Sequence, residues 1–300
     1  MRRQVGQVVA AVVTAVVVAG CGSGPSQLRS AVIVGSTSVP LSQVQSRVDT
    51  ALGKTDLVAR LAGNGVGPPD IARDVVTRSV LHDLLTRTAA AEGIVVSEAD
   101  VDATLQENGG ADATLQQTLY DLPALRERIR DRIIAARHAQ RVVPGLAVTA
   151  DVVGATSEED AAAKARALAA GGPAAEQLFA QSGGASGRGV TYAAAERPEV
   201  ASTVLFGLQP GRTAYFQPSP EGGWVVLRVT DRREDPNADP SVAAALGQDD
   251  LARIGERLLQ PVAEQVGVRV NPRFGVWDPI TLRVVPEGKA GGAVLPPGAA

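Results

Sequence analysis

Residues 93–102 read Gly-Ile-Val-Val-Ser-Glu-Ala-Asp-Val-Asp and join two predicted helices. Gly93 favours the end of a helix, because glycine adopts the left-handed conformation of a helix C-terminus at little cost. Ser97 is a good N-cap for the next helix, and Asp100, three residues later, can complete a shortened capping box. A helix end followed directly by a helix start predicts a helix–loop–helix unit at this point of the chain.

Apolar residues at helical spacing extend this unit in both directions. Asp70 is a good N-cap, and apolar side chains recur on one helix face from Ile71 to Leu85. A short β-branched strand is expected over 31–34, before the first helix. The expected helices cover 41–52, 70–92, 97–107, 111–119 and 122–142. This first part of the chain is therefore expected to be mainly helical.

Val143-Pro144-Gly145 breaks the helical pattern and predicts a domain boundary. The segment that follows is predicted to contain strands over 148–155, 213–216 and 224–229, with an alanine-rich helix capped by Ser157. A last long helix is expected over 242–266, with a kink or a break at Pro261, followed by an edge strand. The predicted fold class is α+β and mainly helical, with a small α/β insert between two helical segments.

The first residues have the layout of a secretory signal peptide. Arg2 and Arg3 precede an apolar run from Val5 to Val18, which is shorter than the about 20 residues of a membrane-spanning helix. The run ends in Val18-Ala19-Gly20-Cys21, which resembles the lipobox of bacterial lipoproteins. The resemblance implies a signal peptide over 1–20 and acylation of Cys21, for instance with palmitate. It also implies an extracytoplasmic protein anchored by lipid to a bacterial cell membrane, whereas an ordinary cleaved signal with a chance cysteine is the alternative.

Composition argues against several classes of function. The formal net charge is −3 without basic blocks, which argues against nucleic acid as a partner. Cys21 is the only cysteine, so its acylation would leave no thiol for a disulfide, a nucleophile or a metal site. His82 and His138 lack metal-ligand spacing, and no metal, cofactor or covalent step is expected. Residues 21–30 are interpreted as a lipidated tether and 287–300 as a disordered tail.

The order of the predicted elements resembles the SurA and PrsA periplasmic or surface foldases. The stretch Gly93 to Asp102 is typical of the N-terminal domain of that family, which reads glycine, isoleucine, any residue, valine and then a capped helix. The resemblance implies a helical chaperone domain made of 31–142 plus 241–277. It also implies a parvulin-like insert over 148–232 between these two segments.

The insert matches the parvulin pattern in two places and departs from it at the active site. Its turn over 205–211 and its last strand over 221–229 are similar to the family's. Active parvulins usually carry a histidine on the first strand and another on the last. Here Asp151 lies near the first of these positions and Val225 occupies the second. The resemblance therefore implies a degenerate site, in which Asp151 is the one catalytic candidate if the chain is an isomerase.

These observations together favour a lipid-anchored holdase or foldase. It would bind unfolded exported polypeptides through apolar grooves, without catalysis. A peptidyl-prolyl cis-trans isomerase with an atypical site and a non-catalytic envelope lipoprotein that tethers a dedicated partner are the alternatives. Phe274 and Trp277 are rare aromatics close together, and they either pack against the helical domain or bind clients.

Overall fold

The computed structural model describes residues 29–182, 186–219 and 221–299. The predicted signal peptide and the lipidation site at Cys21 lie outside these residues. Ser30, the last residue of the predicted tether over 21–30, belongs to a strand, and residues 21–28 lie outside the described ranges. No helix within the described ranges is long and apolar enough to cross a membrane.

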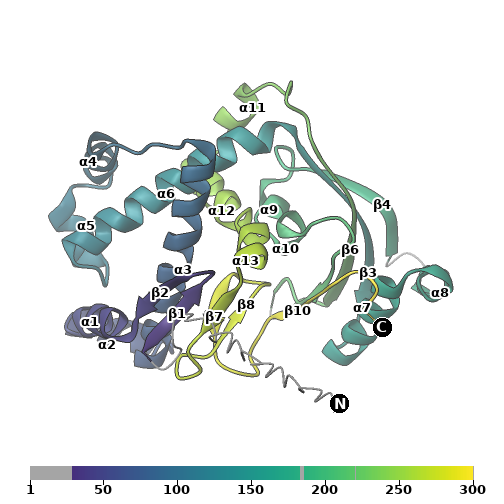
Figure 1. The fold of residues 1–300 in the computed structure, drawn as a ribbon, viewed down its shortest axis with the longest axis horizontal. Coiled ribbons are helices and arrows are strands. Elements are labelled where there is room, and N and C mark those ends of the chain that lie inside the picture. The colour runs from purple at the N-terminus through teal and green to yellow at the C-terminus, as the bar shows by residue number, and fades with distance from the viewer. Residues whose placement is uncertain (1–28, 183–185, 220, 300) are drawn as a thin grey trace, which may run out of the picture.

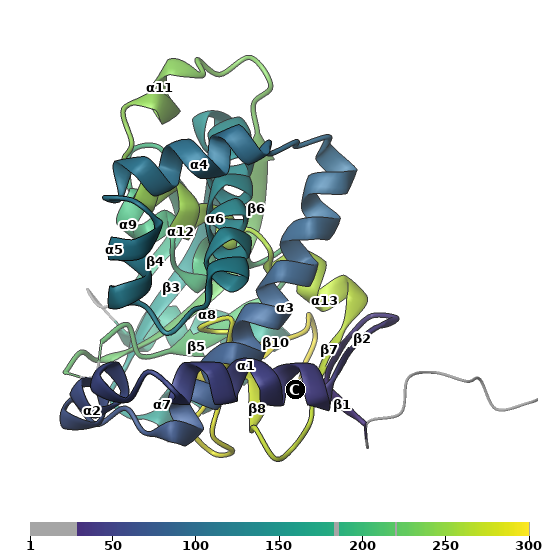
Figure 2. The same cartoon turned by 90° about the vertical axis from the view of Figure 1, so that its left-hand side faces the viewer.

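Residues 41–142 form six helices, as the sequence pattern largely predicts (Figures 1 and 2). Figure 2 shows α1 and α2 at the foot of α3, and α4 and α5 beside α6. The bounds are α1 Leu41–Leu52, α2 Thr55–Gly63, α3 Pro68–Glu92, α4 Glu98–Glu107, α5 Ala111–Gln117 and α6 Leu122–Val142.

The link between α3 and α4 confirms the predicted helix–loop–helix unit. Gly93 has φ +64°, the left-handed conformation that ends α3. Ser97 Oγ accepts a hydrogen bond from the Asp100 backbone N–H at 3.1 Å, and Asp100 Oδ2 accepts one from the Ser97 backbone N–H at 2.8 Å. The shortened capping box is therefore present, and α4 begins where these two residues place it.

The C-terminal helical segment returns to α6. The predicted helix over 242–266 is three helices, α11 Ser241–Ala244, α12 Gln248–Arg257 and α13 Gln260–Val266. Pro261 lies in the first turn of α13, where backbone N–H groups have no acceptor within the helix. Proline is tolerated at this position, and the predicted break occurs just before it. Gly255 of α12 lies so close to α6 that a Cβ built on it would be 1.9 Å from the Ala135 carbonyl oxygen. The two helices thus pack backbone against backbone.

A three-stranded sheet joins the two ends of the helical part. Its order is β2-β1-β7, with both pairs antiparallel. The strands are β1 Ser30–Val34, β2 Thr37–Pro40 and β7 Val268–Val270. β1 lies in the middle of this sheet, between β2, which follows it in the chain, and β7 from the C-terminal segment. Every residue of β1 is buried as a result. The hairpin between β1 and β2 was not predicted, since residues 36–38 have the composition of a turn.

The insert is built on a five-stranded antiparallel sheet of order β10-β5-β6-β3-β4. Val153 and Val226 on one face pack with Ala165 and Leu168 of α7, whereas Leu227 on the other face belongs to the main core. The strands are β3 Leu146–Ala155, β4 Ser186–Ala193, β5 Thr213–Phe216, β6 Trp224–Glu234 and β10 Gly292–Leu295. The helices are η1 Val143–Gly145, α7 Glu158–Ala170, α8 Gly172–Ser182, α9 Pro198–Ala201 and α10 Val204–Gly207.

The prediction of a disordered tail over 287–300 is wrong. Residues 292–295 form β10, which pairs with β5 at the edge of the sheet. A hairpin of β8 Val276–Asp278 and β9 Arg283–Val285 precedes it. A Cβ at Gly292 would lie 1.9 Å from the Tyr215 carbonyl oxygen, so glycine permits this close pairing. The strand depends on its partner rather than on its own composition, which is why composition did not predict it. The predicted class, mainly helical α+β, is confirmed.

Candidate functional site

The two positions that the parvulin resemblance aligns with histidines lie on opposite faces of the five-stranded sheet. Asp151 of β3 pairs with Arg228 of β6, whereas Val225 pairs with Gly154 and with Phe216. Residues 225 and 228 are three apart on one regular strand, and side chains alternate between faces. Asp151 and Val225 therefore cannot contribute to one site.

Asp151 has a local role between β3 and β4, the strand at the edge of the sheet. Its Oδ1 accepts a hydrogen bond from the backbone N–H of Gly189 at 2.9 Å, which ties β3 to β4. Its cross-strand neighbour Arg228 donates to the Leu168 carbonyl of α7 at 3.2 Å. Val225, on the other face, is partly buried against the main core. Residues 148–232 contain no histidine, so a histidine-linked network of the parvulin kind cannot form on either face.

The two C-terminal aromatics pack against the protein. Phe274 exposes 7% of its surface and belongs to the main core, with the Arg273 guanidinium 5.3 Å from the centre of its ring. Trp277 is partly buried against the same core and pairs with Val284 in the β8–β9 hairpin. Phe274 and Trp277 therefore pack against the protein core, which is the first of the two alternatives for these aromatics. The two rings do not form an exposed client-binding surface.

The broad apolar groove expected from the sequence is not present on the described part of the chain. The large apolar side chains that are exposed there come from four separate elements or loops, namely Val95, Leu122, Val242 and Val276. The two long helices bury apolar residues such as Leu84 and Leu85 of α3 and Ile129 of α6, whereas Leu122 at the start of α6 is exposed. Any apolar binding site between these helices must therefore be a hollow between them rather than a broad exposed surface.

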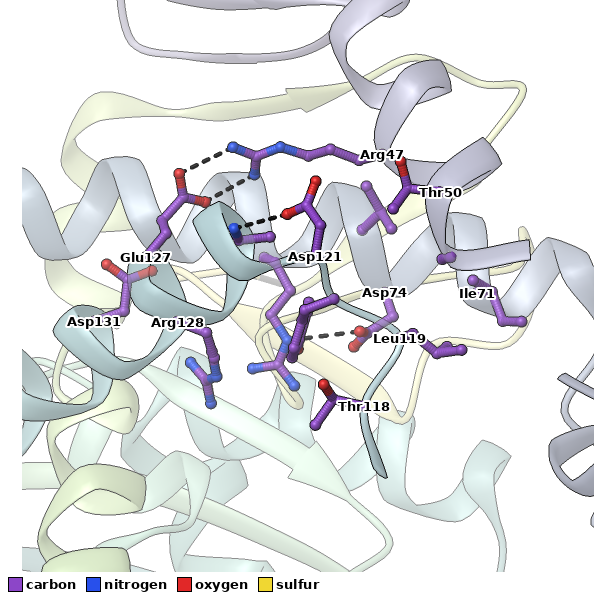
Figure 3. A pocket seen from close by; sticks show the side chains of 15 residues that line it. Arg47, Thr50, Ile71, Asp74, Thr118, Leu119, Asp121, Glu127, Arg128 and Asp131 are labelled. Carbon is purple, nitrogen blue, oxygen red and sulfur yellow. Dashed lines mark hydrogen bonds and ion pairs between the residues drawn. The ribbon is translucent and has the colours of Figure 1, made fainter. Parts of the chain in front are cut away.

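Such a site exists as a cavity of about 260 Å³ between α1, α3, α6 and the connection from α5 to α6 (Figure 3). Its apolar lining comes from all four segments and comprises Ala51, Ile71, Val75, Leu119, Tyr120 and Ala124. The volume is slightly below the about 300–1,000 Å³ of typical ligand pockets. The cavity can therefore admit one or two side chains, but not a folded surface.

Ion pairs and hydrogen bonds fix the walls of this cavity. Arg47 of α1 donates two hydrogen bonds to the Glu127 carboxylate of α6, at 2.8 and 2.9 Å, across one side of it (Figure 3). Lys54 Nζ donates to the carbonyl oxygens of Leu115 and Thr118 at 2.7 and 2.8 Å. These contacts hold α1 to α6 and to the end of α5, so the opening is shaped before any ligand arrives. The sequence pattern does not indicate this site, because its residues are far apart in the chain.

Both histidines link α3 to α6. His82 Nδ1 lies 2.9 Å from Asp131 Oδ1, beside the cavity, and His138 Nδ1 lies 2.7 Å from Glu92 Oε1. Asp131 is only 4% exposed, and this burial raises the pKa of its carboxyl group. The hydrogen bond to Asp131 raises the pKa of His82 above its usual value, in spite of partial burial. The histidines therefore pair with carboxylates between α3 and α6.

The pair of His82 and Asp131 predicts a pH-dependent stability. A histidine whose pKa is raised in the folded state stabilises the fold fully below its unfolded pKa of about 6.5, and this contribution is lost as pH rises through the folded pKa. We expect His82→Gln to lower the free energy of unfolding by about 1–3 kcal/mol at pH 6, less than for a fully buried pair because His82 is partly exposed. Urea unfolding at pH 6 and pH 9 measures the effect, which should be smaller at pH 9.

A second variant separates charge from packing. Adding Asp131→Asn to His82→Gln removes the buried carboxylate that the single variant leaves without a cation, and should restore part of the lost stability. An equal loss for His82→Gln at both pH values would contradict the assignment of a charged pair.

One family model matches the segment that contains the insert. Residues 137–245 match the family model described as the PPIC-type PPIASE domain. The search of curated proteins gave no match. Within the described ranges, no group of three or more His, Cys, Asp or Glu side chains is arranged to hold a metal ion.

Similar solved structures include two foldase proteins called PrsA. That of Lactococcus lactis is 13% identical, with 81% of this chain and 95% of that chain covered and a TM-score of 0.24. That of Streptococcus pneumoniae is 12% identical, with 77% and 89% covered and a TM-score of 0.24. The family match is confined to the segment that contains β3 to β6, so it is this segment that is similar to a PPIC-type PPIASE domain.

Proposed function

We propose that this protein is an extracytoplasmic, lipid-anchored chaperone that holds unfolded segments of exported polypeptides. The observation that carries the proposal is the apolar-lined cavity between α1, α3 and α6. In this account an apolar side chain of a client enters the cavity and is thereby withheld from aggregation. No covalent step and no cofactor takes part.

The size of the cavity sets the strength of binding. Burial of one large apolar side chain contributes about 1.5–3 kcal/mol, which is less than the about 4 kcal/mol of a millimolar complex. A single client contact is therefore weak, and useful retention requires several contacts or a high local concentration of chaperone. A lipid anchor at Cys21 would supply that local concentration at the membrane where exported chains emerge.

The proposed domain organisation keeps the helical chaperone domain over 31–142 plus 241–277 and the parvulin-like insert over 148–232. The close approach of α12 to α6 at Gly255 supports the pairing of the two helical segments. The family match over 137–245 includes the proposed insert. The insert would add a second surface beside the cavity-bearing helices.

Prolyl isomerase activity is the second candidate, because residues 137–245 match a PPIASE domain. It is less well supported than holding, since Asp151 and Val225 lie on opposite faces of the sheet. We therefore expect Asp151→Ala to leave any chaperone activity unchanged.

Refolding of a test protein whose slow phase is limited by a native cis proline tests the proposal. The rate of the slow phase and light scattering are recorded together. We expect reduced scattering only near stoichiometric amounts of the chain, with the slow phase unchanged and Asp151→Ala indistinguishable from the natural protein. Acceleration of the slow phase by catalytic amounts would identify an isomerase. No effect on either signal would favour a dedicated partner instead of general clients.

A further inference from the structure

A second cavity, of about 170 Å³, lies where α3, α12 and the turn between β8 and β9 meet. Four arginines of the described chain line it, namely Arg78, Arg253, Arg257 and Arg283, whereas Glu256 is the acidic residue among its lining. Guanidinium groups gathered around a small space create a positive potential that attracts anions.

Carboxylates near this cavity are already engaged by other cations. Glu256 forms an ion pair with Arg128 of α6 at 2.8 Å. Arg78 lies 3.6 Å from Asp74, and Arg253 pairs with a carboxylate of its own helix. The remaining positive charge is therefore concentrated on the two other arginines.

Arg257 and Arg283 have no ion pair among the described residues. Arg257 is 5% exposed and donates only to neutral oxygens, the carbonyls of Ile280 at 2.6 Å and Pro279 at 3.0 Å and the side chain of Gln260. Its Nε has no hydrogen-bond partner within the described part of the chain. Burial lowers the pKa of Arg257 to about 10, although the carboxylates of Asp278 and Glu264 attract its charge from a distance.

The turn that precedes Arg283 is held in an unusual conformation. Leu282, directly before Arg283, has φ +54°, a region that side chains larger than glycine rarely adopt. Asp278 fixes the turn, because its Oδ1 accepts a hydrogen bond from the Ile280 backbone N–H at 2.9 Å. The Asp278 carboxylate therefore hydrogen-bonds within the turn, and it acts on Arg257 only through longer-range electrostatic attraction. Backbone strain of this kind is often retained where a site needs it.

We propose that this cavity binds one oxyanion, a carboxylate or a phosphate group, between Arg257 and Arg283. Planar guanidinium groups match the oxygens of both anions, and a space of about 170 Å³ limits the ligand to one small group. The bound anion would neutralise two cations that come from α12 and from the C-terminal hairpin. The proposal is independent of client binding, because the cavity is separate from the apolar one, although Arg78 lines both.

Thermal unfolding of the purified full-length chain tests this site, with inorganic phosphate and acetate as probes. Each is added at 10 mM and compared with sodium chloride at equal ionic strength. A ligand bound with a dissociation constant of about 1 mM should raise Tm by about 3 °C. Arg283→Ala should abolish the rise. Arg269→Ala removes an exposed arginine of β7 outside the cavity and should retain the rise.

The two probes distinguish the sources of the anion. A rise with phosphate alone identifies a phosphate site, and a rise with acetate alone identifies a carboxylate site, provided that Arg283→Ala abolishes it. The proposal is overturned by the absence of any rise over sodium chloride in the natural protein. It is also overturned by a rise of equal size in Arg283→Ala.

Discussion

Replacing Gly255 by alanine is expected to lower the free energy of unfolding by about 3 kcal/mol or more. The added Cβ would lie 1.9 Å from the carbonyl oxygen and 2.5 Å from the carbonyl carbon of Ala135. Both are backbone atoms, so no side-chain rotation relieves the overlap, and α12 must move away from α6. That movement would loosen the packing of Leu251 and Ile254, which are fully buried. Urea unfolding monitored by circular dichroism measures the loss.

Gly63→Ala is the matched control for this prediction. Gly63 is the last residue of α2, is exposed, and has nothing within 4 Å of an added Cβ. Alanine there should stabilise the protein by about 0.5–1 kcal/mol, because glycine loses more conformational freedom on folding. If the free energy of unfolding of Gly255→Ala were within about 1 kcal/mol of that of the natural protein, the close packing of α12 on α6 would be contradicted.

Filling the apolar cavity should remove most of the chaperone activity. Ala124 lies in the first turn of α6 and lines the cavity, so Ala124→Phe places a ring in the space proposed for a client side chain. Loss of a burial contribution of about 1.5–3 kcal/mol corresponds to at least a tenfold rise in the concentration that halves aggregation. Light scattering of an unfolded test protein, titrated with the variant, measures this concentration.

Ala103→Phe is the control for the effect of an added ring. Ala103 is exposed on α4 and does not line the cavity. The same ring at this position should leave the activity within about twofold of the natural protein, or raise it slightly through added apolar surface. Equal activity of Ala124→Phe and the natural protein would show that clients bind elsewhere.

Local signals explain the part of the fold that the sequence predicted. The capping box of Ser97 and Asp100 and the glycine at the end of α3 depend on residues within one helical turn. These residues therefore determine the helix ends without help from distant parts of the chain. Pro261 likewise breaks the C-terminal helical segment wherever that segment packs. Helix ends with such caps could therefore be predicted from the sequence alone.

Strands and the candidate site depended on distant residues. The start of β4, within the glycine-rich stretch 183–189, and all of β10 have loop-like compositions, and they become strands because β3 and β5 offer them hydrogen-bond partners. The apolar cavity is built by residues such as Arg47 and Glu127, which are 80 positions apart. No periodicity connects such positions. The resemblance to parvulins indicated Asp151 as the catalytic candidate instead. The strand pairing of the structure is needed to show that Asp151 and Val225 lie on opposite faces of the sheet.

In the proposed mechanism, unfolded clients enter the cavity between α1, α3 and α6. Site-specific photocrosslinking detects this entry, with a photoreactive residue in place of Thr50, an exposed residue at the rim of the cavity (Figure 3). The same residue in place of Ala103 is the control. We predict crosslinks to an unfolded exported polypeptide from position 50, competed by an excess of apolar peptide, and few from position 103. Equal crosslinking from both positions, or crosslinks from position 103 alone, would contradict the account.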